Sequence, residues 1–295
     1  MQVPGTITGK TSIHPWKTAA IILTRDEELH IERAIRSVEG RVDVIYVIDS
    51  LSVDRTVAIA QASGAKVLEH EWISYADQMN WAIAQLPDDI EWVLRLDADE
   101  YLSGEVDFKA ERARLLDENS DIQGILCRRS MVFTGTLLRF GGMYKKPVLR
   151  LFRKNNAICD ARLVDEHIHV DGPVAKANIH IIDDNLKGIS FWIEKHNRYA
   201  ELEARQYLKE QACVPAQATA PARGHAPSLQ KRKRGLYYRL PPAFRPFAYF
   251  FYRYVLLGGF LDGYAGFRYG FLQAFWYRFL VEIRIREYRS ERQDK

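Results

Sequence analysis

Three acidic residues, Asp97, Asp99 and Glu100, stand within four positions directly after a short apolar run. The run, residues 91–96, is rich in β-prone residues and is typical of a strand buried in a sheet. In an extended chain the side chains of Asp97 and Asp99 lie on the same side, with the small Ala98 between them. Two such carboxylates suit a hard divalent cation, which in turn can bind a diphosphate. The alternative for these residues is a solvated acidic turn.

The elements that must position this acidic turn alternate between strand and helix patterns. Strands are predicted at residues 18–24, 43–49, 66–70 and 91–97, and helices at residues 29–38, 55–63 and 77–85. This order predicts an α/β fold with a mostly parallel sheet and right-handed crossovers. Ligands of such sheets collect at the carboxyl ends of the strands. Polar groups follow three of those ends, at Thr24–Glu27, Asp49–Ser50 and Asp97–Asp99, so we expect a site there.

Four motifs follow one another in the first hundred residues: Ile-Leu-Thr-Arg-Asp-Glu-Glu at 22–28, Val-Ile-Asp-Ser-Leu-Ser-Val-Asp-Arg-Thr at 47–56, Tyr-Ala-Asp-Gln-Met-Asn-Trp-Ala at 75–82 and Leu-Asp-Ala-Asp-Glu at 96–100. In this order they resemble the motifs of family 2 glycosyltransferases. The resemblance covers about residues 18–200 and is closest to the bacterial branch that builds lipopolysaccharide cores and exopolysaccharides. Two positions depart from the family pattern. Arg25-Asp26 stands where Asn-Glu is more usual, and Leu51 stands where Gly is frequent.

The resemblance implies a GT-A fold, in which a nucleotide-binding α/β sheet carries an appended acceptor half. It also implies roles for individual residues. Thr24 and Glu27 would line the nucleotide pocket, Asp49 with Ser50 would bind uracil or ribose, Gln78 and Asn80 would lie near the donor, Asp97 would bind ribose or metal, and Asp99 would bind the metal that bridges the two phosphates. Two alternatives stay open. Asp49-Ser50 is also compatible with a turn or helix cap, and Gln78 and Asn80 with exposed helix polars.

An inverting transfer needs a base that removes a proton from the acceptor hydroxyl. In the family an acid in the region of residues 161–172 does this, and Glu166 matches by position, with Asp165 as its rival. Alternation places these two on opposite faces of an extended segment, so only one points inward. A surface Glu-His ion pair is the alternative. The spacing of the nearby histidines does not define a zinc site, and whether His180 joins the metal or diphosphate site stays open.

Residues 147–153 alternate so that Arg150 and Phe152 share one face of a predicted strand, and Leu151 and Arg153 the other. Arg150 and Arg153 are both suited to contact the phosphate of a donor or a phosphorylated acceptor, because guanidinium groups bind phosphate well. The alternative is an edge strand protected by charge. We take Arg150 as the donor-site candidate.

The C-terminal part of the chain differs in composition from the rest. We divide the chain into an irregular leader at 1–17, a catalytic domain at 18–211, a linker at 212–230 and a helical tail at 231–295. The tail holds fourteen Lys and Arg against five Asp and Glu, and nineteen of the 35 aromatic residues. This pattern is typical of a membrane surface, with rings buried among headgroups and guanidinium groups in water. A chain ending near residue 230 is then expected to be more soluble and still bind donor.

The tail has three other interpretations. Charges interrupt every apolar window there, which disfavours a spanning helix, and no nucleic-acid module accompanies the basic residues. The remaining rival is a helical hairpin with its turn at Gly258-Gly259 and Gly263, packed on the catalytic domain or on a second subunit, which leaves a homo-oligomer open.

Together these patterns predict an inverting glycosyltransferase that uses Mg or Mn to move a sugar, with a UDP-sugar as the first choice of donor, to a lipid-linked acceptor. Three scattered cysteines and an N-terminus without a secretory profile place it in the cytoplasm, on the inner face of the membrane. One rival is a nucleotide-binding scaffold of the same fold without transfer activity. The other is a Mg-dependent nucleotidyl- or phosphotransferase, although the chain has no Walker-type Gly-rich loop.

Overall fold

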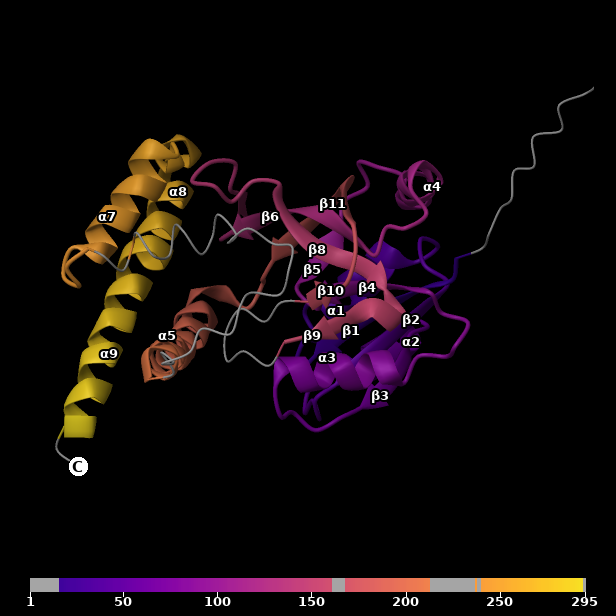
Figure 1. Cartoon of the computed structure of the whole chain (residues 1–295), viewed down its shortest axis with the longest axis horizontal. Helices are drawn as coiled ribbons and strands as arrows, with labels where there is room; N and C mark the ends of the chain where they lie inside the picture. The colour runs from indigo at the N-terminus through magenta and orange to yellow at the C-terminus, as the bar shows by residue number, and fades with distance from the viewer. Residues whose placement is uncertain (1–15, 161–167, 213–236, 238–239, 294–295) are drawn as a thin grey trace, which may run out of the picture.

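The computed structural model describes residues 16–160, 168–212, 237 and 240–293. Its strands are β1 (Thr18–Thr24), β2 (Val44–Asp49), β3 (Lys66–Glu69), β4 (Trp92–Asp97), β5 (Glu100–Leu102), β6 (Gly124–Phe133), β7 (Thr136–Leu137), β8 (Lys146–Arg153), β9 (Ala157–Cys159), β10 (Ile168–Val170) and β11 (Val174–Asp184). Its α-helices are α1 (Ile31–Val38), α2 (Thr56–Ala62), α3 (Tyr75–Ala84), α4 (Phe108–Glu118), α5 (Gly188–Ala212), α7 (Arg245–Phe251), α8 (Gly263–Tyr269) and α9 (Tyr277–Gln293). Figure 1 shows the sheet and its helices on one side and the C-terminal helices on the other.

The main sheet has the strand order β3-β2-β1-β4-β8-β6-β11-β5, with β7 paired to β6. Its first four strands are parallel, as the alternation of strand and helix patterns predicts. The second half is mixed, because β8 runs antiparallel to both β4 and β6, while β11 is parallel to β6. The α/β fold with helices on a mostly parallel sheet is confirmed. A separate two-stranded ribbon joins β9 and β10.

Strand β1 lies at the centre of the parallel half and is covered on both faces. Ala20 and Ile22 pack into the cluster that contains α1 and α4, whereas Ala19 and Ile21 pack into the cluster that contains α3. This double burial explains why the strand reads as a continuous apolar run without alternation. Every residue from Thr18 to Ile22 is fully buried, so the carboxyl end of the strand is fixed in place.

The C-terminal helices form a hairpin that packs on α5. One arm consists of α7 and a π-helical continuation, Tyr252–Leu256. The other consists of α8, a second π-helical stretch, Gly270–Trp276, and α9. A 3₁₀ turn, Gly259–Asp262, joins them and is flanked by Gly258 and Gly263, both with positive φ. The aromatic helical extension is therefore present, with its turn at the expected glycines.

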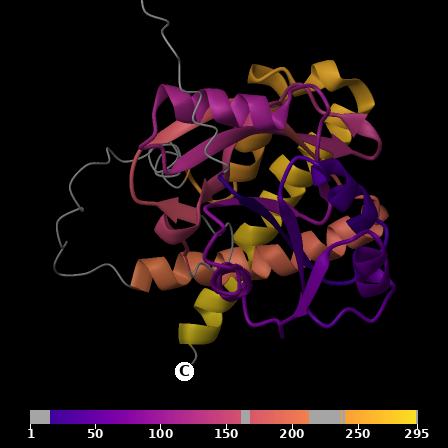
Figure 2. The same ribbon diagram turned by 90° about the vertical axis from the view of Figure 1, so that its right-hand side faces the viewer.

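The second arm packs closely on the turn at Gly266, where an added Cβ would lie 2.1 Å from the carbonyl oxygen of Gly259. Further along, α9 crosses α5 (Figure 2) and the two helices share a core. That core consists of Ala200, Ala204, Tyr207, Leu208, Tyr277, Val281 and Ile285. Helix α5 follows β11 directly along the chain and also shares its core with α9. It therefore contacts both predicted parts of the chain, and the domain boundaries at 211 and 230 stay predictions. Within the described ranges, no helix has the length and apolar character needed to cross a bilayer.

Candidate functional site

The carboxyl ends of β1, β2 and β4 lie side by side, as predicted. Thr24 is in register with Asp49, and Leu23 with Asp97. The Thr24 hydroxyl donates to Asp49 Oδ1 at 3.0 Å. Thus the sheet brings together three of the predicted strand-end residues along one edge.

Asp49 organises the turn that follows β2. Its carboxylate is almost fully buried and accepts hydrogen bonds from the Ser52 amide at 2.7 Å and the Ser52 hydroxyl at 2.5 Å, in addition to Thr24. Leu51 in this turn has φ = 57°, in the left-handed region that favours glycine. Glycine adopts this conformation without steric strain, which fits the Gly of the family pattern that the motifs resemble. The side chain of Leu51 is exposed, so the turn accommodates its bulk at the surface.

The two polar residues of α3 occupy different places. Gln78 is fully buried, donates to the Ser50 hydroxyl and donates to the carbonyl of His70 at 3.1 Å. Asn80 pairs with the backbone of Cys159 in both directions, at 3.1 and 3.0 Å, and so fixes β9 to α3. Gln78 thus lies beside the turn after β2, whereas Asn80 joins α3 to the strand before the segment predicted to carry the base.

At the acidic turn Asp97 is surrounded by donors. Its carboxylate accepts from Arg150 at 3.0 Å and from the Tyr75 hydroxyl at 3.2 Å, and Arg95 lies at 3.5 Å. Burial acts to raise the pKa of Asp97, but Arg150 and Arg95 outweigh it and hold that pKa well below its usual range. Asp97 is therefore ionised at any physiological pH.

Arg150 lies beneath the acidic turn. It is 5 % exposed and pairs with both Asp97 and Glu100, and Glu100 is fully buried. Glu100 also pairs with Arg129 at 2.7 Å, and Arg129 pairs with Asp183. Burial raises the pKa of Asp183 to about 7 against the opposing effect of Arg129, with Asp99 and Glu100 raising it further. Arg150 thus lies beside the acidic turn, and its described contacts are with the carboxylates of Asp97 and Glu100.

Asp99 is partly exposed, and its Oδ2 accepts from the side-chain amide of Asn185 at 3.0 Å. Lys195 on α5 faces the same turn. Burial acts to lower the pKa of this lysine, but Asp99 foremost, and Asp183 and Asp97 with it, raise it. The described residues include no group of three or more His, Cys, Asp or Glu side chains placed to hold a metal ion. A divalent ion here would rely on the acidic turn together with substrate oxygens and water, which suits Mg²⁺.

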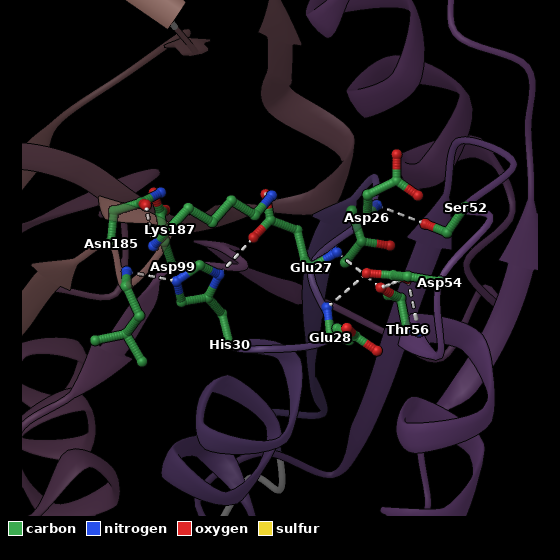
Figure 3. Close-up of polar contacts among 12 residues, drawn as sticks. Asp26, Glu27, Glu28, His30, Ser52, Asp54, Thr56, Asp99, Asn185 and Lys187 are labelled. Carbon is green, nitrogen blue, oxygen red and sulfur yellow. Dashed lines mark hydrogen bonds and ion pairs between the residues drawn. The ribbon is translucent and has the colours of Figure 1, made fainter. Parts of the chain in front are cut away.

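The segment Asp184–Lys187, which we call the bridging segment, contacts both the first motif and the acidic turn (Figure 3). The Lys187 ammonium lies 2.8 Å from Glu27 Oε1, and the Leu186 amide donates to His30 Nε2 at 2.7 Å. Sequence reasoning singled out neither Asn185 nor Lys187 nor His30. The one signal was the polar run Asp183-Asp-Asn-Leu-Lys187 after an apolar strand pattern, which resembles the other strand ends.

The remaining predicted residues lie elsewhere. His180 is buried on β11, with Ser130 Oγ at 2.8 Å and Glu105 at 3.3 Å, and its described partners do not include the acidic turn. His169 is exposed and pairs with Asp160 at 3.0 Å. Glu166, Asp165 and His167 lie outside the described residues, so the choice of base stays a prediction.

Residues 19–160 match the model of glycosyl transferase family 2. This matched segment is just under half of the chain and contains the acidic turn described above, and the sheet with its helices has the architecture of the GT-A fold.

Individual proteins resemble the chain over shorter stretches. An uncharacterized glycosyltransferase of Rickettsia bellii is 43 % identical over 95 residues, which are 32 % of each chain. A TPR repeat-containing protein of Synechococcus elongatus is 43 % identical over 82 residues, 28 % of this chain and 20 % of that one. The matches thus span about a third or less of these relatives. Among solved structures, glucosyl-3-phosphoglycerate synthase from Mycobacterium tuberculosis, in complex with Mn²⁺, UDP and glucosyl-3-phosphoglycerate, is 22 % identical to the chain in sequence. The match covers 40 % of this chain and 45 % of that one, with a TM-score of 0.33.

Proposed function

We propose that this protein is an inverting, metal-dependent glycosyltransferase that moves a sugar from a nucleoside-diphosphate donor to a lipid-linked acceptor in bacterial lipopolysaccharide or exopolysaccharide synthesis. The donor of first choice is a UDP-sugar. The observation that carries the proposal is the position of the acidic turn, within a family 2 domain, at the edge where β1, β2 and β4 end. Ligands bind at this edge in open α/β sheets.

Within this site Asp99 is the carboxylate best placed for a divalent cation. It is partly exposed, and the Asn185 amide fixes the orientation of its side chain. Asp97 is surrounded by Arg150, Arg95 and Tyr75, so its charge is already compensated by protein groups. The cation, when bound, would stabilise the negative charge that develops on the leaving diphosphate.

In the transfer the bond between the sugar C1 and the diphosphate oxygen breaks, and its electron pair leaves with the nucleoside diphosphate. The acceptor oxygen forms the new bond to C1 from the opposite face, and its proton passes to the base. We assign the base to Glu166, with Asp165 as the alternative, because this pair follows β9, which Asn80 fixes to α3.

A screen of donors tests the proposed reaction. The full-length protein is mixed with UDP-, GDP- and dTDP-sugars, each with Mg or Mn, and thermal stability and released nucleotide are measured. We expect metal-dependent stabilisation, largest with a UDP-sugar, and release of nucleoside diphosphate when a lipid-linked acceptor is added. Release of sugar 1-phosphate would instead indicate a nucleotidyltransferase, and release of nucleoside monophosphate would indicate a transferase of the phosphorylated sugar. Binding without any release would indicate a scaffold, and no binding would contradict the assignment of the site.

Substitution of the two acids separates the candidates for the base. Glu166→Gln is expected to lower turnover by roughly two to four orders of magnitude, the range that loss of general base catalysis gives. Donor affinity, measured by calorimetry, should change little, because the base acts on the acceptor. Asp165→Asn serves as the matched variant. If Asp165→Asn is the inactive protein and Glu166→Gln is active, the roles of the two residues are reversed.

We further propose that the C-terminal hairpin rests on an anionic membrane surface on the cytoplasmic side. Between residues 244 and 285 no charged side chain is among the exposed ones. The charged residues contact the protein instead: Arg245 pairs with Glu282, Arg278 with Glu203, and Asp262 accepts from the Arg139 amide. The sequence-based expectation that the guanidinium groups here lie in water is therefore wrong for these arginines.

What the hairpin exposes is a continuous aromatic surface. Phe267, Phe271, Phe275 and Phe279 contact one another in series along one arm, and Phe247 of the other arm contacts Phe275. We call these five residues the aromatic ladder. Further exposed apolar side chains on the hairpin are Phe244, Phe251, Val255, Leu256, Phe260, Leu261, Tyr264 and Ile283. A patch of this kind rarely faces water in a monomer, and a bilayer interface next to a lipid-linked acceptor would cover it.

A further inference from the structure

The bridging segment is fixed to the sheet edge at both of its ends. The Asp184 amide donates to the carbonyl of Asp99 at 3.0 Å, and Arg33 of α1 pairs with the Asp184 carboxylate at 2.7 Å. Asn185 donates to Asp99, and its own side-chain oxygen accepts from the Lys187 amide at 3.0 Å. The segment therefore has a defined position relative to the residue that we assign to the cation.

His30 determines how Glu27 is oriented. Because a backbone amide can only donate, the contact from the Leu186 amide leaves His30 Nε2 as an acceptor. The proton of the neutral ring is then on Nδ1, which donates to Glu27 Oε2 at 2.6 Å. The other oxygen, Glu27 Oε1, accepts from Lys187. Both carboxylate oxygens of Glu27 are thus hydrogen-bonded. Glu27, which is predicted to line the nucleotide pocket, therefore positions the ammonium of Lys187.

Three arginines near this edge differ from Lys187 in what surrounds them. Arg150 and Arg129 each contact two carboxylates, and Arg33 contacts Asp184 and lies over the Tyr101 ring. Lys187 contacts one carboxylate oxygen and the face of Phe191, and its side chain is 15 % exposed. An ammonium has three donors, so Lys187 can bind a further anion without losing its contact with Glu27.

A nucleoside diphosphate brings further negative charge to the edge where Asp99 lies, and the described contact of the Asp99 side chain is with a neutral amide. Charge-assisted hydrogen bonds from a fixed cationic side chain would stabilise the diphosphate there. Figure 3 shows the Lys187 side chain extending from beside Asn185 and Asp99 toward Glu27, between the acidic turn and the first motif. A diphosphate held by a cation on Asp99 would lie within reach of this side chain.

We propose that Lys187 binds the diphosphate of the donor, with Asn185, Glu27 and His30 as its positioning residues. The inference rests on the proposed function, since it takes the donor to be a nucleoside-diphosphate sugar. Asn185 orients the Asp99 carboxylate for the cation, and Glu27 with His30 orients the Lys187 ammonium. The bridging segment connects both groups to the end of β11.

The experiment compares ligands that differ only in their phosphates. Binding of UDP, UMP and uridine in the presence of Mn is measured by calorimetry for the wild type, for Lys187→Gln and for Lys187→Arg. Lys187→Gln should weaken UDP binding by roughly ten- to a hundredfold, the range of a charged hydrogen bond, and leave uridine binding unchanged. Lys187→Arg, which keeps the charge, should recover most of the loss. Lys176→Gln, an exposed lysine of β11 on the strand that leads into the segment, is the matched control.

A second measurement uses the unaltered protein, so that it does not depend on the folding of a variant. The protein is labelled by reductive methylation and modification of each lysine is followed by mass spectrometry. UDP with Mn should protect Lys187, uridine should not, and Lys176 should be unaffected by either. Equal weakening of UDP and uridine by Lys187→Gln, or no protection of Lys187 by a UDP that does bind, would show a purely structural lysine. If the wild type binds none of UDP, GDP or dTDP, the proposed function itself fails.

Discussion

Asp99→Ala is expected to abolish sugar transfer and the metal dependence of donor binding, while the fold is retained. Asp99 lies in the turn between β4 and β5, and the one described hydrogen bond of its side chain is with Asn185. Removing it leaves Asn185 partly exposed to water, and Asp183 and Asp97 remain near the ammonium of Lys195, so the loss of stability should be moderate. A cation supplies several kcal/mol of transition-state stabilisation, so turnover should fall on the order of a thousandfold or more.

The measurements are turnover and nucleoside diphosphate affinity with and without Mg or Mn. Asp117→Ala, which removes an exposed acid from α4, is the control for a simple change of charge. Thermal unfolding of both variants shows whether the fold is kept. A folded Asp99→Ala protein with near-normal turnover, or one whose donor affinity still rises with metal, would remove Asp99 from the metal site.

The sequence predicted the parallel part of the sheet closely because its signals there are local. The predicted strand at residues 18–24 is β1, and the helix predicted at 55–63 is observed as Thr56–Ala62. A buried strand covered by helices on both faces produces an apolar run, and turn residues mark its ends. The carboxyl ends of neighbouring parallel strands lie at the same edge of a sheet. The proximity of Thr24, Asp49 and Asp97 follows from this rule.

What the sequence did not predict depends on contacts between distant segments. Lys187 is 160 residues from Glu27, and Arg150 is 50 residues from Glu100. No periodic pattern in the sequence links the two members of either pair. An arginine on a predicted strand is also equally compatible with binding a phosphate and with forming a buried ion pair. Asn80 has the same ambiguity, because its partner is the backbone of Cys159. The composition of the tail suggested a membrane surface as its partner, but only the structure shows that Arg245, Arg253 and Arg278 contact protein groups.

The structure also corrects the expectation for a shortened chain. Removing residues 231–295 would leave Ala200, Ala204 and Tyr207 of α5 without the α9 side chains that cover them. A newly exposed apolar helix face favours aggregation, so this truncation should be less soluble. Point substitutions on the outer face of the hairpin are the better test of membrane association, because they leave the contact between α5 and α9 intact.

The double variant Phe247→Asp/Phe271→Asp is expected to abolish binding to anionic liposomes, to which the unaltered protein should bind. Both residues belong to the aromatic ladder and are exposed. Burying a phenylalanine side chain gives about 1.5–3 kcal/mol when complete, and an aspartate adds repulsion from the anionic surface. Together these changes should weaken partitioning by roughly a hundredfold or more, measured by co-sedimentation. Ile73→Asp/Ile158→Asp, at apolar positions outside the hairpin that are even more exposed, should bind as before.

Salt separates the two sources of the attraction. Basic residues near an anionic surface contribute about 1 kcal/mol each, and screening shortens to about 3 Å near 1 M salt, whereas aromatic burial does not weaken. Arg245, Arg253 and Arg278 contact protein groups, whereas Arg286 and Arg289 near the end of α9 are exposed. The salt-sensitive part should therefore come from Lys231–Arg234 together with these two arginines, and Gln at the four positions 231–234 should weaken that part alone. High salt should therefore release the protein only partly. A protein that stays in the supernatant at low salt as a stable dimer, and becomes a monomer in Phe247→Asp/Phe271→Asp, would show instead that a second copy covers the aromatic ladder.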